Sequence, residues 1–170
     1  LDTVYVPLAA TDFQMTGGSS QIDLNHILAC GPRLVITGGP GSGKTTVLQH
    51  IAWTLTLALF QDQPALAAER VGLPLEKDAA LPLPIFVPLS AYAQHRRSLP
   101  ATSQAQQRTL ASFISHYLID KQTTLRLPAD FFARLLNEGQ TVLLLLDGLD
   151  EVPDDDERAM VREAIQDLAA

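Results

Sequence analysis

Eight consecutive residues, Gly38 to Thr45, have the composition of a loop that binds phosphate groups. They spell GGPGSGKT and match the pattern G-x-x-x-x-G-K-[ST], with Gly38, Gly43, Lys44 and Thr45 at the fixed positions. Glycines leave room for backbone N–H groups to approach phosphate oxygens closely. Lys44 is expected to reach the β and γ phosphates, and the Thr45 hydroxyl is expected to ligate Mg²⁺. The spacing therefore predicts binding of a nucleoside triphosphate together with Mg²⁺.

The elements around this loop favour a phosphate site over a plain tight turn. A short β-branched run, RLVIT at 33–37, precedes it and predicts a buried strand. The apolar run at 44–60 follows and predicts a crossover helix, whose positive end would also face the phosphates. The predicted nucleotide contacts are Gly38, Gly39, Pro40, Gly41, Ser42, Gly43, Lys44, Thr45 and Thr46.

A second chemical signal is an apolar run that ends in acids, VLLLLDGLDE at 142–151. Asp147 at the end of this predicted strand is expected to hold Mg²⁺ through its water shell. Asp150 and Glu151 follow, and they are candidates to orient or deprotonate an attacking water. Acids before a helix also serve as caps, so a purely structural role for these two residues stays open. The spacing of the run does not fit a calcium loop.

The remaining patterns predict an α/β fold, a three-layer sandwich with a mainly parallel sheet. The lead-in would hold a strand at 3–6 and a short helix at 22–28, and the loop at 61–83 would hold a helical turn at 65–70. The other expected elements are a strand at 84–89, helices from Leu110 and from Pro128 to Gly139, a strand at 141–148 and a helix after Pro153. The polar stretch 95–107 reads as a mobile loop, with Arg96, Arg97 and Arg108 on a solvated face.

Composition excludes several classes of protein. The 170 residues carry a net charge of −7, which argues against a general nucleic-acid surface. The longest apolar run is too short to span a bilayer, and the N-terminal residues do not resemble a secretory signal. Cys30 is the single cysteine, so we expect a reducing, cytoplasmic compartment. The four histidines are too dispersed in the sequence to form a local metal motif.

Three segments together resemble the NACHT division of the STAND class of P-loop ATPases. They are GGPGSGKTT at 38–46, the proline-bearing PIFVPLSAY at 84–92, and LLLLDGLDEV at 143–152. VYVPL at 4–8 also resembles the segment that precedes the P-loop in bacterial members. The resemblance implies a nucleotide switch that is closed with ADP, opens with ATP and then oligomerises. It implies, as partners, the remaining domains of a parent chain and other copies of that chain.

The sequence does not continue to the sensor strand of this class, so we expect a lead-in at 1–30 and a partial P-loop core at 31–170. Hydrolysis by this piece alone is expected to be weak or undetectable. Without the sensor strand, a gap in the sheet would separate the strands at 33–37 and 141–146. We expect this gap to be filled by direct pairing of the two strands, by residues 3–6 or by another chain. Either adenine or guanine could be the base.

Two other interpretations stay open. One is a P-loop enzyme of another kind, such as a small-molecule kinase or an AAA+-type loader. A kinase would need clustered arginines over the phosphates, and the sequence shows only Arg96 and Arg97 close together. The other is a nucleotide-binding scaffold that never turns over.

Overall fold

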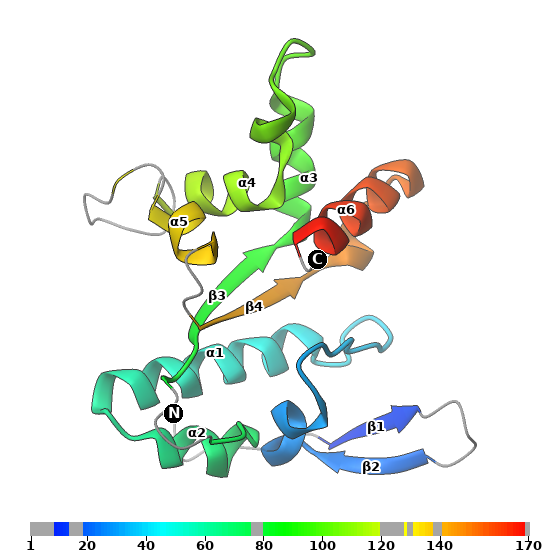
Figure 1. Cartoon of the computed structure of the whole chain (residues 1–170). Helices are drawn as coiled ribbons and strands as arrows, with labels where there is room; N and C mark the ends of the chain where they lie inside the picture. Colours follow the sequence, from blue (N-terminus) through cyan, green and yellow to red (C-terminus); the bar gives the residue numbers. More distant parts are fainter. Residues whose placement is uncertain are drawn as a thin grey trace. The chain divides into compact units, whose positions relative to one another are not determined.

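The computed structural model describes residues 9–13, 19–75, 80–119, 128, 131–137 and 141–168 of the chain. The chain is a mixed α/β protein that divides into two compact units, residues 1–84 and residues 85–170 (Figure 1). The phosphate-loop sequence belongs to the first unit. The acidic run at 147–151 belongs to the second.

The first unit begins with an antiparallel hairpin of β1, Ala9–Phe13, and β2, Ser19–Asp23. The 3₁₀ helix η1, Leu24–Cys30, follows directly. The side chain of Asp23 caps it by accepting a hydrogen bond from the Asn25 backbone N–H at 3.1 Å. The predicted helix at 22–28 is therefore a 3₁₀ helix that starts two residues later. The predicted strand at 3–6 lies outside the described residues.

Two helices complete the first unit: the sequence predicts the first, and the second is a full helix where only a helical turn within a loop is expected. Helix α1 spans Lys44–Gln61, and α2 spans Pro64–Val71 with its proline in the first turn. Asp62 and Gly72 end these helices in the left-handed conformation, with φ of 52° and 68°. The α1 side chains that are buried come from positions spaced along one side of the helix: Val47, Ile51, Thr54, Leu55 and Ala58.

The prediction of a buried strand at 33–37 is wrong. Residues 34–39 have no regular secondary structure, and Val35 is 90% exposed. A strand needs a hydrogen-bonded neighbour, and the sheets in the described part of the chain pair β1 with β2 and β3 with β4 only. The apolar, β-branched composition of RLVIT fits a strand, but composition alone does not supply the partner.

The second unit is built on two parallel strands, β3, Leu83–Pro88, and β4, Val142–Asp147 (Figure 1). The helices α4, Leu110–Tyr117, and α6, Asp155–Leu168, match their predictions closely. Helix α5 is described over Phe131–Asn137, inside the predicted 128–139, of which residues 129–130 and 138–139 lie outside the described residues. The 3₁₀ helices are η2, Ala105–Arg108, and η4, Leu149–Glu151.

Helix α3, Leu89–Ser98, corrects the interpretation of 95–107 as a mobile loop. Its buried residues are Leu89, Tyr92 and Ala93, the spacing of one helix face. Of the polar residues in its last turns, Arg97 and Ser98 are exposed, whereas His95 and Arg96 are half-buried. Three of the last four residues of α3 are charged or ionisable, and this polar composition leads to the prediction of a loop.

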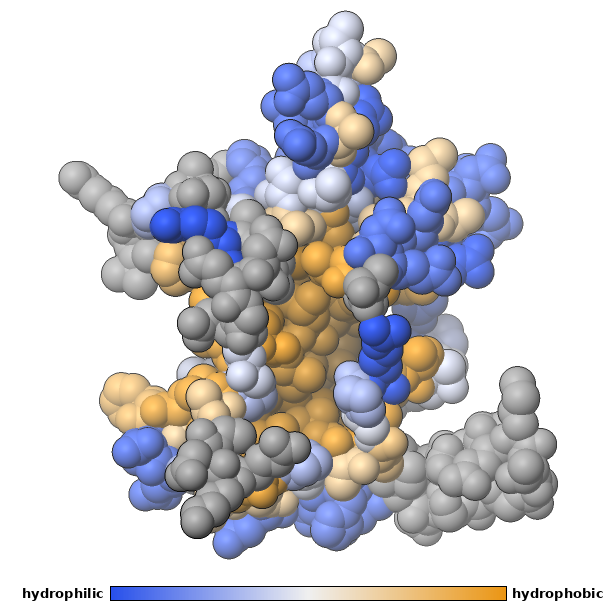
Figure 2. All heavy atoms as spheres, in the orientation of Figure 1, coloured by the Kyte–Doolittle hydropathy of each residue, from blue (hydrophilic) through white to orange (hydrophobic). Residues whose placement is uncertain are grey.

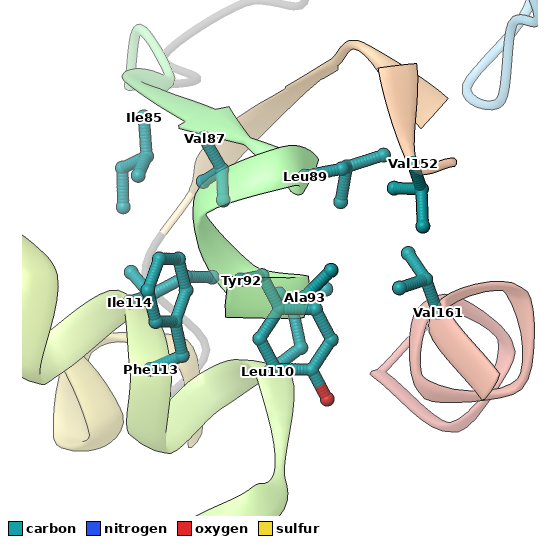
Figure 3. Packing of buried hydrophobic residues seen from close by; sticks show 10 residues of the cluster. All are labelled: Ile85, Val87, Leu89, Tyr92, Ala93, Leu110, Phe113, Ile114, Val152 and Val161. Carbon is teal, nitrogen blue, oxygen red and sulfur yellow. The ribbon is translucent and has the colours of Figure 1, made fainter. Parts of the chain in front are cut away.

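The core of the second unit lies between one face of the two strands and helices α3, α4 and α6 (Figure 3). Ile85 and Val87 of β3 point to this face, and Val142, Leu144 and Leu146 of β4 pack against the same cluster. The buried members of the cluster are Ile85, Val87, Leu89, Tyr92, Ala93, Leu110, Phe113, Ile114, Val152 and Val161.

Apolar residues also gather along β3 and β4 in the space-filling view (Figure 2). Because side chains alternate along a strand, Leu143, Leu145 and Asp147 lie on the face of β4 opposite the helical core. The helices of this unit cover one face of the sheet. The three-layer sandwich predicted from the sequence is not seen in the described residues, in which the parallel sheet has two strands.

Candidate nucleotide-binding site

The loop at 38–43 turns sharply into the start of α1. The Ser42 backbone N–H donates a hydrogen bond to the Gly39 carbonyl at 3.2 Å. Gly41 and Gly43 have φ of 73° and 85°, in the left-handed region that favours glycine. Two of the glycines in the motif are thus required by the backbone path itself.

The other two glycines differ in the space around them. A methyl group on Gly38 would lie 2.5 Å from Ser42 Oγ and 3.1 Å from Ser42 Cβ, so the turn closes tightly at this point. A methyl group on Gly39 would meet nothing within 4 Å. The same holds for Gly41, whose outer side is open. The loop therefore presents an uncovered backbone, which is the surface that a phosphate group needs.

Lys44 folds back over this loop. Its Nζ donates to the Gly38 carbonyl at 2.8 Å and to the Gly39 carbonyl at 3.2 Å. Both bonds are exposed, and they place the ammonium on the loop whose backbone should wrap the phosphates. A cation held there is available to an incoming anion after a small movement of one flexible side chain.

The first turn of α1 faces the same region. Gly43 precedes the helix and supplies no side-chain cap, and the first turn contains no acidic residue. Helix α1 is 18 residues long, so its backbone dipoles give a partial positive charge at this end. Thr45 and Thr46 are exposed in this turn. The chemistry of these glycines, of Lys44 and Thr45 and of the helix end is suited to an anionic ligand, and the site itself stays a prediction.

The predicted acids lie together at the end of β4 in the second unit. Asp147 is the last residue of the strand and is half-buried, whereas Asp150 and Glu151 are exposed in η4. Gly148 makes the turn between them with φ of 75°. A methyl group there would lie 2.9 Å from Glu151 Oε2, so the Glu151 carboxylate lies against Gly148.

Arg158 fixes the chain directly after these acids. Its Nε and Nη2 donate to the Val152 carbonyl at 3.1 and 2.8 Å, and its Nη1 bonds to Asp155 Oδ1 at 2.7 Å. Val152 is fully buried in the core. The sequence did not single out Arg158, since an arginine in an acidic helix start is usually a surface residue.

The structure groups other residues that sequence reasoning kept apart. Arg96 and Arg97 lie on α3 rather than in a loop, and with Arg108 they line one hollow beside α6. The rings of His95 and His116 lie 5.3 Å apart, although 21 positions separate them in the sequence. In the parts of the chain that the structure describes, no group of three or more His, Cys, Asp or Glu side chains could hold a metal ion.

Within those same parts, no helix is both long enough and apolar enough to cross a bilayer.

Comparisons with known proteins indicate the family of the chain. Neither a curated protein nor a solved structure matches the chain. The family model for the NACHT domain, however, matches residues 32–170, which include both the phosphate-loop sequence and the acidic run. NACHT domains are nucleotide-binding NTPase domains of the P-loop type. This chain belongs to the NACHT domain family.

Proposed function

We propose that the chain binds ATP or GTP with Mg²⁺ at residues 38–46 and acts as the nucleotide switch of a larger cytoplasmic signalling or defence protein. One observation carries the proposal. Lys44 Nζ lies on the carbonyls of Gly38 and Gly39, beside an open glycine backbone at the uncapped start of a long helix. Backbone N–H groups, one mobile cation and a helix N-terminus are together a receptor for a polyphosphate.

Each residue of the loop has a role in this proposal. The backbone N–H groups of Gly39 and of residues 41–45 would receive phosphate oxygens, whereas Pro40 has no N–H to donate. Thr46 continues the same turn of helix. Lys44 exchanges its two carbonyl acceptors for the β and γ phosphates. Gly41 and Gly43 have the left-handed backbone conformation through which the loop would present its N–H groups to the phosphates. Mg²⁺, when bound, neutralises phosphate charge, and the proposal assigns the Thr45 hydroxyl and Asp147 to it.

The acids after β4 would act on water. Glu151 is the proposed general base, and Asp150 is proposed to orient the same water. Gly148 and Arg158 hold the turn that carries both residues. Turnover by this chain alone is expected to be slow, because P-loop NTPases commonly take part of their catalytic charge from an arginine supplied elsewhere.

The match to the NACHT family supports nucleotide binding by an NTPase domain. We further propose the finer features of the STAND class: exchange of ADP for ATP opens the parent protein, which then oligomerises. A complete three-layer P-loop sheet is part of the same proposal.

Ligand-induced stabilisation tests the proposal. MgATP or MgGTP at a hundredfold excess over Kd should raise the free energy of unfolding by about 2.7 kcal/mol. Lys44→Ala should lose most of this gain and keep the stability of the ligand-free protein, because its two hydrogen bonds are exposed. Equal stabilisation of the variant and the parent would show that the phosphate site lies elsewhere.

A further inference from the structure

A hollow lined by charged and apolar side chains lies within the second unit. It has a volume of about 220 Å³, and its walls come from α3, η2 and α6. Three arginines line it, Arg96, Arg97 and Arg108, together with Glu157. It adjoins a wider hollow of about 440 Å³, with which it shares Arg96 and Arg108. Cationic side chains that are distant in the sequence thus meet around one space.

The charges in the smaller hollow do not cancel. Arg97 Nε lies 3.3 Å from Glu157 Oε1, which pairs one guanidinium with the one carboxylate of the lining. Arg96 and Arg108 have no carboxylate oxygen within ion-pair distance among the residues that the structure describes. Within the smaller hollow, the Arg96 and Arg108 guanidinium groups therefore have no directly paired carboxylate, whereas Glu163 and Asp167 line the adjoining wider hollow together with them.

Both of these guanidinium groups are held in place by neutral partners. Arg96 donates from Nη1 to the Met160 carbonyl at 3.3 Å and approaches Met160 Sδ at 3.6 Å from Nη2. Arg108 donates from Nη2 to the Pro100 carbonyl at 2.8 Å. A guanidinium has five N–H donors, so each keeps several for another acceptor. Carbonyl contacts fix the groups without neutralising their charge.

Tyr92 links the two arginines to the core. Its ring is fully buried, and the Arg96 guanidinium lies 5.8 Å from the ring centroid. The Tyr92 hydroxyl donates to the Arg108 carbonyl at 2.7 Å, which ties α3 to η2. Preorganised donors of this kind lose little freedom when a ligand binds.

The rest of the smaller hollow is apolar. Ala93, Met160 and Val161 line it, and Ala93 and Val161 belong to the buried core. An apolar wall beside guanidinium groups that have no directly paired carboxylate suits a ligand with an oxyanion at one end and a carbon body at the other.

We propose that this hollow binds a small organic anion. Its carboxylate or phosphate group would accept hydrogen bonds from Arg96 and Arg108, and its apolar body would lie against Ala93, Met160 and Val161. Arg97 and Glu157 would close one side as a neutral pair. The hollow's lining residues are all different from those of the phosphate loop, and the proposal does not rest on nucleotide binding.

NMR titration of the full chain with phenyl phosphate and with benzoate tests this proposal. We expect saturable shifts of the Arg96 and Arg108 Nε–Hε signals and of the Met160 methyl signal at millimolar ligand. Inorganic phosphate should bind at least about fivefold more weakly than phenyl phosphate, because it lacks the apolar body. Benzoate as the tighter ligand would identify a carboxylate site, and phenyl phosphate as the tighter ligand would identify a phosphate site.

Matched variants complete the test. Arg96→Gln and Arg108→Gln should each weaken binding about tenfold or more, since each removes a charge-assisted donor. Arg108→Lys keeps the charge but loses the planar fork, and it should weaken binding less. Arg162→Gln, on the exposed side of α6, should leave binding unchanged. Shifts confined to residues 38–46, or equal binding by the parent and both Gln variants, would overturn the proposal.

Discussion

Lys44 Nζ and the Gly38 carbonyl oxygen lie 2.8 Å apart, so the lysine of the phosphate motif is bonded to the first glycine of the same motif. The loop thereby supplies its own partner for the ammonium. A polyphosphate must displace this contact, and it replaces two exposed neutral acceptors with negatively charged oxygens. The exchange is favourable, and the contact keeps Lys44 on the loop before the nucleotide arrives.

Gly41→Ala should weaken nucleotide binding, and Gly39→Ala, at a position without a left-handed φ, controls for the stability of the loop. Gly41 has φ of 73°, where an alanine costs about 1–2 kcal/mol, and the loop would relax away from the conformation that binds phosphate. A loss of this size corresponds to a Kd about five- to thirtyfold higher. Gly39 has open space around it, so its alanine variant should fold normally. Isothermal titration with MgATP compares them, and a Gly41→Ala affinity equal to the parent's would contradict the role given to this backbone.

Gly72→Ala should destabilise the first unit strongly. Gly72 has φ of 68°, and an added methyl group would lie 2.5 Å from His26 Cα, a backbone atom that cannot move aside cheaply. The left-handed conformation alone costs about 1–2 kcal/mol, and the clash adds to it. Urea unfolding followed by Trp53 fluorescence measures the change. Neutral surface variants usually lie within about 0.5 kcal/mol of the parent. A Gly72→Ala variant with a free energy of unfolding in that range would show that α2 does not pack tightly against η1 at Gly72.

Arg158→Met should destabilise the turn after β4 without touching the phosphate loop. The substitution removes two hydrogen bonds to the Val152 carbonyl, which is part-buried, so we expect a loss of about 1.5–3 kcal/mol. Arg162→Met on the same helix is the control, because Arg162 is exposed. Chemical denaturation of the two variants compares them. Equal stabilities would mean that Arg158 is only a surface residue.

Acidification below about pH 6.5 should destabilise the protein. Burial of the ring, and then the neighbouring His116, lower the pKa of His95 in the folded protein. Burial likewise lowers the pKa of His50 in α1. The unfolded chain, with an ordinary histidine pKa near 6.5, then binds more protons, so stability is full above that pH and falls as the pH drops through it.

Urea unfolding at pH 7.5 and 5.5 measures this loss, and carboxylates with ordinary pKa values contribute little over that range. His95→Gln should reduce the difference between the two pH values. His26→Gln, at an exposed position, is the control. A His95→Gln variant with the same pH dependence as the parent would contradict the assignment.

The elements with strong local signals could be predicted from the sequence. Helix α1 has a glycine directly before it, α6 has acids in its first turn, and β4 is a nearly unbroken apolar run. The phosphate motif needed no tertiary information, because its glycines encode the backbone conformation directly. Gly41 and Gly43 have the positive φ that such a loop requires.

Features that depend on partners could not be predicted in this way. The segment 33–37 has a strand's composition but not a strand's structure, because pairing decides the outcome. The hollow with Arg96 and Arg108 arises from helices that meet in three dimensions, and no spacing in the sequence encodes it. The Arg158 contact with Val152 is likewise visible only once the turn is folded.

The most direct test of the account is to follow the backbone amide signals of residues 38–46 by NMR while MgATP or MgGTP is added. Bound phosphates should move the signals of Gly41, Gly43, Lys44 and Thr45 most, and Lys44→Ala should suppress the change. Nucleotide binding that leaves these amides unmoved and shifts signals elsewhere would contradict the claim that this glycine backbone receives the phosphates.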